Sequence, residues 1–151
     1  MITIIAIGKR HEPWLADGIA RYEQRMTRAW QLQWKLLPAG SHSGDAARRE
    51  ESQQILRVLS PQSYVVLLDE RGTMLDSPTL SRSLHQPIAQ GKSLVLIIGG
   101  AYGVTEAVME RANLVWSLSR LVFPHQLVRL ILAEQLYRAQ QIAAGHPYHH
   151  Q

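Results

Sequence analysis

The segment from Leu94 to Gly103 reads LVLIIGGAYG, an apolar run that ends in a loop rich in glycine. The run predicts a strand over residues 93–98, and the loop predicts a strand-to-helix turn. Its three glycines would let a ligand approach the backbone closely, although a purely structural turn accounts for them equally well. The spacing is not G-x-G-x-x-G, and the loop follows the fourth predicted strand rather than the first. Both facts argue against a dinucleotide-binding fold.

Strands and helices alternate along the rest of the chain. Apolar or alternating stretches predict further strands at residues 1–7, 32–36, 64–68 and 115–118. Helices are predicted at residues 13–26, 45–59, 77–90, 105–111 and 124–144, with Asp45 and Ser77 as N-caps of the second and third. This order predicts a single α/β domain, in which a parallel sheet is flanked by helices and connected by right-handed crossovers.

The loops at the carboxyl ends of the strands are the predicted ligand site, because ligands of parallel α/β sheets bind there. Three of these loops span residues 69–72, 99–103 and 119–123. They are poor in acidic side chains except at Asp69 and Glu70. A ligand is therefore expected at these three loops.

Length and composition exclude several classes of protein. The chain has 151 residues, close to one domain, and no cysteine, which excludes disulfides, cysteine-ligated metal sites and a thiol nucleophile. The lack of cysteine suits a reducing cytoplasm. The longest apolar run, Leu94–Ile98, is far below the roughly 20 residues that a membrane span needs. Residues 1–7 lack a basic leader, so no secretory signal is expected.

Arginine dominates the positive charge of the chain. The net charge is +4, and 13 of the 16 basic residues are arginine. Guanidinium groups favour bidentate recognition of phosphate or carboxylate, so this bias is consistent with RNA binding. An ordinary solvated surface is an equally good interpretation, and the charge alone leaves both open.

Motifs of other enzyme classes are incomplete. The GKS sequence at residues 91–93 resembles the end of a phosphate-binding loop, but position 86 is Gln rather than Gly, and a strand follows the serine. No G-x-S-x-G motif is present, so a covalent serine mechanism has no support. His146, His149 and His150 lie near the C-terminus without a neighbouring carboxylate, and no metal site is predicted.

The last predicted helix is apolar on more than one face. A helix of this kind is buried, and in so short a chain a second copy is the simplest cover for its outer face. The sequence therefore predicts a homodimer. Glu134 and Arg138 stand four residues apart on this helix, and we expect them to form an ion pair. The apolar residues are Leu127, Val128, Leu130, Ile131, Leu132, Ala133, Leu136, Ala139, Ile142 and Ala143.

Several motifs, taken in order, resemble one family. They are IAIGK at 5–9, PAG at 38–40, LIIGGAYG at 96–103, WSLS at 116–119, FPHQLVR at 123–129, EQLYRA at 134–139 and HPYH at 146–149. Together they resemble the RlmH type of SPOUT methyltransferase, the pseudouridine N3-methyltransferases of large-subunit ribosomal RNA. The resemblance covers essentially the whole chain in one colinear register.

The resemblance implies an α/β-knot fold, in which the C-terminal segment threads through a loop of the sheet. It also implies a homodimer packed through its terminal helices, and S-adenosylmethionine as the cofactor. Carried over by position, the cofactor contacts are Leu68, Gly99, Leu118, Ser119, Arg120, Leu121, Val122 and Phe123. These residues fall in or beside the three loops selected above.

The implied reaction is N3-methylation of a pseudouridine in helix 69 of 23S rRNA, within the assembled ribosome. The target nitrogen must lose a proton. The candidates to accept it are Glu134, or Tyr148 or His149 from the tail of the partner subunit. The expected RNA contacts are Arg129, Arg138, Tyr148 and His149.

Two other functions stay open on the sequence alone. One is a non-enzymatic RNA-binding or ribosome-binding α/β module that has lost cofactor binding, against which the glycine-rich loop and residues 118–123 argue. The other is a SPOUT methyltransferase that acts on tRNA. We expect no appended RNA-binding domain, and this disfavours a tRNA substrate.

Overall fold

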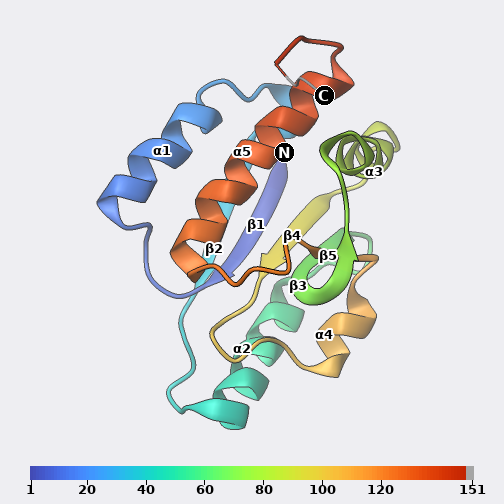
Figure 1. The fold of residues 1–151 in the computed structure, drawn as a ribbon. Coiled ribbons are helices and arrows are strands. Elements are labelled where there is room, and N and C mark those ends of the chain that lie inside the picture. Colours follow the sequence, from blue (N-terminus) through green and yellow to red (C-terminus); the bar gives the residue numbers. More distant parts are fainter. Residues whose placement is uncertain (149–151) are drawn as a thin grey trace.

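Five strands, all parallel, form one sheet at the centre of the described part of the chain (Figure 1). The computed structural model describes residues 1–148. In spatial order the strands are β2 (Leu32–Leu37), β1 (Ile2–Ile7), β4 (Leu94–Ile98), β3 (Tyr64–Met74) and β5 (Leu114–Ser117). The prediction of a parallel α/β sheet is therefore confirmed.

Helices cover both faces of the sheet (Figure 1). One face carries α1 (Pro13–Glu23), α3 (Ser77–Ala89) and α5 (His125–Ala143), with α5 packed between the other two. The other face carries α2 (Gly44–Val58) and α4 (Glu106–Arg111). No helix within residues 1–148 is long and apolar enough to cross a bilayer.

Two apolar layers follow from the two-residue repeat of the strands. In β1, Ile4 and Ala6 belong to a core that includes Leu132 of α5, whereas Ile5 belongs to a core that includes Ile55 of α2. Strands that are apolar throughout are what a parallel sheet covered on both faces requires. Because the strands are buried, the loops at the carboxyl edge of the sheet begin at fixed positions.

β3 is longer than the sequence predicts. The prediction ended this strand at Leu68 and treated residues 69–72 as a loop. The strand instead continues to Met74, with an irregularity between Leu68 and Thr73, and its last two residues pair with β5. The polar residues of this stretch do not show the apolar pattern that predicts a strand. The extension forms because the stretch pairs with β5, a segment distant in sequence.

The N-cap positions of two helices lie one and two residues before the predicted caps. Asp76 rather than Ser77 caps α3, since its carboxylate accepts a hydrogen bond from the Thr79 amide at 2.8 Å. Ser43 rather than Asp45 precedes α2, and the Asp45 carboxylate forms ion pairs with arginines inside the helix.

α5 is covered on both flanks, by α1 and by α3 (Figure 1). Leu132 is fully buried, whereas Leu130 and Ile131 are half-buried. The predicted ion pair between Glu134 and Arg138 is confirmed, with an N–O distance of 2.5 Å. Much of the apolar surface of this helix is thus covered within one chain, and the homodimer stays a prediction.

Candidate functional site

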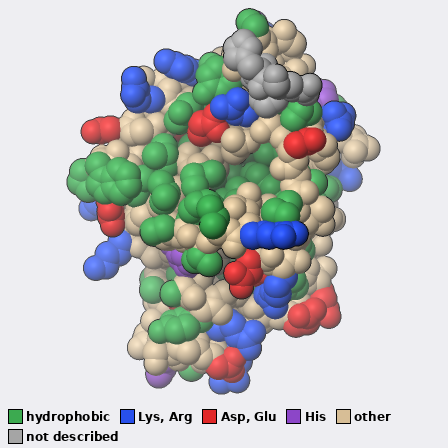
Figure 2. All heavy atoms as spheres, in the orientation of Figure 1, with side chains coloured by type: hydrophobic (Ala, Val, Ile, Leu, Met, Phe, Trp, Pro, Cys, Tyr) green, Lys and Arg blue, Asp and Glu red, His purple; other side chains and the backbone are tan. Residues whose placement is uncertain are grey.

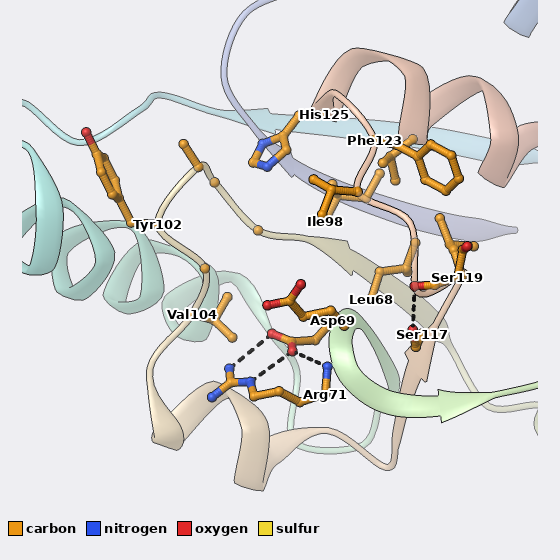
Figure 3. Close-up of a pocket in the computed structure, with 18 of the residues that line it drawn as sticks. Leu68, Asp69, Arg71, Ile98, Tyr102, Val104, Ser117, Ser119, Phe123 and His125 are labelled. Carbon is orange, nitrogen blue, oxygen red and sulfur yellow. Dashed lines mark hydrogen bonds and ion pairs between the residues drawn. The ribbon is translucent and has the colours of Figure 1, made fainter.

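A cavity of about 570 Å³ opens at the carboxyl edge of the sheet, where β3, β4 and β5 end (Figure 3). The segments that follow β4 and β5 contribute to its wall, as the strand-end rule predicts, together with residues 68–71, where β3 becomes irregular. Arg48 of α2, with His125 and Val128 of α5, completes it. The volume lies within the range of small-molecule sites, roughly 300 to 1,000 Å³.

Residues 99–103, here called the glycine loop, approach the cavity mainly with backbone. The amide of Gly103 donates to the carbonyl of Gly100 at 3.0 Å, and Gly103 has a φ of 76°, which favours glycine. Gly99 has little space for a side chain, because a Cβ atom there would lie 2.9 Å from Cγ1 of Val104. A side chain at position 99 would therefore displace Val104, which also lines the cavity.

α2 supports the glycine loop from behind. Glu51 is 4% exposed, and its Oε2 accepts a hydrogen bond from the amide of Gly40 at 2.8 Å. Its Oε1 has no hydrogen-bond partner and lies so close to Gly100 that a side chain there would collide with it. The neighbouring Ser52 Oγ accepts a bond from the Thr105 amide at 2.9 Å. Through these two side chains, α2 holds the loop that contains Gly40 and the segment just after the glycine loop. Oε1 of Glu51 is left buried without a hydrogen-bond partner.

An ion pair forms part of the wall that β3 contributes (Figure 3). The Asp69 carboxylate accepts hydrogen bonds from the amide and Nε of Arg71, both at 2.9 Å, and from Nη2 at 3.0 Å. Hydrogen bonds from Arg71 hold the pKa of Asp69 below its ordinary value, against the opposing effect of burial. Asp69 is therefore a carboxylate at neutral pH and a poor proton acceptor.

Residues 118–123, apart from Arg120, form the wall that follows β5. Ser117 Oγ donates to the carbonyl of Ser119 at 3.2 Å, and the amide of Leu121 donates to Ser119 Oγ at 3.0 Å. These bonds turn the chain tightly at the cavity. Leu121 and Val122 line its mouth while remaining 72% and 84% exposed, and half-buried Phe123 closes the segment.

His125, the first residue of α5, places its imidazole in the cavity wall (Figure 3). Burial lowers the pKa of His125 below its ordinary value, and the positive charge of Arg129 lowers it further. The negative charge of Glu51 acts in the opposite direction. The ring is therefore neutral at neutral pH and has one nitrogen that can accept a proton.

The cavity brings together most of the predicted cofactor contacts. Arg120 is not part of its wall, and the role of the other contacts in holding a cofactor stays a prediction. Within residues 1–148, no group of three His, Cys, Asp or Glu side chains is placed to hold a metal ion. The predicted contacts that line the cavity are Leu68, Gly99, Leu118, Ser119, Leu121, Val122 and Phe123.

Three predicted catalytic or RNA-binding side chains gather elsewhere, towards the end of α5. The hydroxyl of Tyr148 donates to Oε1 of Glu134 at 3.4 Å, and the guanidinium of Arg138 lies 5.0 Å from the centre of the Tyr148 ring. Glu134 and Tyr148 line a second cavity of about 580 Å³ between α1 and α5. His149 lies outside the described residues. In its own chain, this cluster is not part of the first cavity's wall.

The expectation that Arg129 contacts RNA is wrong for this structure. Arg129 is 1% exposed, and its Nη1 donates to the carbonyl of Lys9 at 2.8 Å and its Nη2 to that of Ile7 at 3.4 Å. Its Nη1 also lies 3.2 Å from Nδ1 of His11. An enclosed guanidinium of this kind cannot reach a phosphate. It ties the end of β1 to α5 instead.

His125 and Glu51 were not among the predicted site residues. His125 belongs to the FPHQLVR motif, so the sequence did contain a signal for it. Glu51 gave none, because α2 is a polar helix and only tertiary packing buries this carboxylate.

Comparisons with known proteins identify the family and the fold. A family model described as "Predicted SPOUT methyltransferase" matches residues 1–149. "Ribosomal RNA large subunit methyltransferase H" of Thioalkalivibrio sulfidiphilus is 42% identical over 152 residues, covering 98% of this chain and 97% of that protein. The protein of the same name from Coxiella burnetii is 38% identical, covering 98% of each. A solved methylase family protein from Neisseria gonorrhoeae shares the fold, with a TM-score of 0.56 and 14% identity over 99% of this chain and 86% of that one.

Proposed function

The chain belongs to the SPOUT methyltransferase family, and on that premise we propose that it methylates ribosomal RNA of the large subunit. The proposed acceptor is N3 of a pseudouridine in helix 69 of 23S rRNA, within the assembled ribosome. The proposed methyl donor is S-adenosylmethionine, bound in the cavity at the carboxyl edge of the sheet. Similarity over the full length to relatives named Ribosomal RNA large subunit methyltransferase H supports the RNA substrate.

The chemistry of the cavity fits this donor, and this observation carries the proposal. Leu68, Leu118 and Phe123 supply an apolar part of the wall that suits a purine ring. Gly99 lines the cavity without a side chain, so the wall there is main chain. The Asp69 and Glu70 carboxylates offset the positive charges of Arg48 and Arg71 in the same wall, so the wall as a whole does not repel the positively charged sulfur of the donor.

Positioning is the main contribution of this chain to the proposed reaction. When bound, S-adenosylmethionine supplies a methyl group activated by a positively charged sulfur. Methyl transfer is an in-line displacement, so holding acceptor and donor in the right geometry supplies most of the rate gain. The buried strand ends and the glycine loop suit that task, since Glu51 of α2 packs against Gly100 and Ser52 of α2 holds the amide of Thr105, just after the loop.

A homodimer is part of the proposal. Glu134, Arg138 and Tyr148 lie together outside the cavity of their own chain, so a role in methyl transfer requires a site shared with a second copy. Figure 2 displays apolar side chains gathered on the face that carries α1 and α5, a surface that a partner would cover. His149 of the partner's tail would reach this shared site as an RNA contact. Arg138, Tyr148 and His149 are the proposed RNA contacts.

Radiolabelled S-adenosylmethionine tests the substrate assignment. The purified protein is incubated with the labelled donor and, separately, with ribosomes, free ribosomal RNA or tRNA. We expect label in large-subunit RNA of assembled ribosomes. Label on tRNA alone would contradict the assignment, and no label on any RNA would favour a binding module without activity.

A further inference from the structure

We propose that His125 accepts the proton that the target nitrogen loses during methyl transfer. The inference rests on the proposed function, because it assigns a residue to that reaction. The imidazole of His125 forms part of the wall of the cavity that would hold the methyl donor (Figure 3). It lies at the first residue of α5, so the helix fixes its backbone position.

The other ionisable side chains of the cavity wall are poorly suited to accept a proton. Asp69 is committed to hydrogen bonds from Arg71. Glu70 and Tyr102 are exposed at the rim. Arg48 and Arg71 are cations, which have no proton-accepting atom. Among the described residues of the wall, His125 is therefore the group with an accessible acceptor nitrogen inside the site.

Two buried charges of opposite sign act on the ring. Arg129 stands one helical turn later on α5 and is buried, with its own hydrogen bonds to carbonyl groups of residues 7 and 9. Glu51 of α2 is buried with its Oε1 unpaired. His11, which contacts Arg129 from the loop after β1, also has a lowered pKa because of burial and the Arg129 charge.

A proton acceptor must be neutral before the reaction and positively charged after it, and the charges of Arg129 and Glu51 favour these two states in turn. Burial and the Arg129 charge lower the pKa of His125, so the ring is neutral before the reaction. The unpaired Glu51 carboxylate favours the imidazolium that forms afterwards. Glu51 is therefore a positioning residue, which acts through His125 rather than on the substrate.

The step balances without any further reactant. The N3–H bond of the target base breaks, and its proton moves to the acceptor nitrogen of His125. The N3 lone pair forms the new bond to the methyl carbon, while the electron pair of the broken sulfur–carbon bond stays on sulfur. The imidazolium then releases its proton to solvent.

Replacement of His125 by Asn tests the role, with His85→Asn as the matched control because His85 is exposed on α3. We expect H125N to bind S-adenosylmethionine within about threefold of the wild type in calorimetry. Its single-turnover rate on ribosomes should fall about 100-fold or more, the usual contribution of a general base. H85N should keep both values. A wild-type rate in H125N, or loss of binding in that variant, would overturn the proposal.

Nuclear magnetic resonance of histidine-labelled protein gives a reading independent of activity. The ring of His125 should titrate below the ordinary histidine pKa in the wild type. Glu51→Gln removes the charge that raises this pKa, so the titration of His125 and the acid limb of the rate profile should both move to lower pH. An acid limb that stays in place while the titration moves would overturn the assignment.

The two hypotheses fail in different ways. Label absent from ribosomes with wild type and H85N alike would overturn the proposed function and, with it, this step. Label present with wild type, H85N and H125N at equal rates would overturn only the role of His125.

Discussion

Gly99 is the position at which a single side chain should most directly affect the cofactor cavity. A Cβ atom there would lie 2.9 Å from Cγ1 of Val104, at the edge where backbone and ligand approach each other. We expect Gly99→Val to weaken S-adenosylmethionine binding at least about tenfold in calorimetry, a loss of roughly 1.4 kcal/mol. Ala143→Val adds two of the same three carbon atoms at an exposed position of α5, and this variant should bind normally. Wild-type affinity in Gly99→Val would contradict the location of the site.

Arg129 should matter for stability. Its guanidinium donates to two backbone carbonyls from a fully enclosed position, and a lysine ammonium cannot reproduce this fork. We expect Arg129→Lys to lower the free energy of unfolding by about 2 kcal/mol in urea denaturation. Arg49→Lys, at a side chain 64% exposed, should change it by less than about 0.5 kcal/mol. Equal denaturation midpoints for Arg129→Lys and the wild type would show that the paired hydrogen bonds of this guanidinium do not contribute to stability.

At the scale of elements, the extension of β3 beyond Leu68 depends on a close approach between backbones. A Cβ atom on Gly72 would lie 2.5 Å from the carbonyl oxygen of Val115 in β5. Gly72→Val should therefore push β5 away and lower the free energy of unfolding by about 2 kcal/mol. Thr73→Val, at an exposed neighbour in the same strand, is the control and should have little effect. Equal losses in both variants would contradict this account.

The two central strands that the sequence predicted share one property. Residues 64–68 and 93–98 are apolar runs whose burial on both sides leaves few alternatives, so a local pattern was enough. The extension of β3 carries polar residues and exists because β5 pairs with it, which no local pattern encodes. The caps of α2 and α3 were displaced because residues able to cap stand close together in the sequence.

The location of the site could be predicted from the sequence, but the burial of its charged side chains could not. The meeting of the three strand-end loops follows from a parallel sheet, so the rule for carboxyl edges located the cavity. The resemblance had already indicated seven of the residues that line it. The burial of individual charged side chains could not be predicted from the sequence. Arg129 and Glu51 are buried because α5, β1 and α2 pack around them in the folded chain. For this reason Arg129 was wrongly expected at the RNA surface.

At the scale of the whole molecule, the account requires two copies. Half-buried Ile131 lines the cavity between α1 and α5, on the face proposed to meet a partner. Light scattering should give a mass about twice 17.1 kDa for the wild type and a monomer for Ile131→Glu. Leu132→Glu distinguishes this effect from misfolding, since Leu132 is fully buried and a charge there should unfold the chain. A monomeric wild type at micromolar concentration would contradict the dimer.

Mass spectrometry of nucleosides from treated ribosomes most directly tests the claim that this chain methylates a pseudouridine of ribosomal RNA. The product depends on the cavity, the methyl donor and the acceptor nitrogen together. Ribosomes without the modification are incubated with S-adenosylmethionine and either the wild-type protein or Gly99→Val. The account predicts N3-methylated pseudouridine in the helix 69 fragment of 23S rRNA with the wild type, and little or none with the variant. A methyl group on a different nucleoside, or equal modification by both proteins, would contradict it.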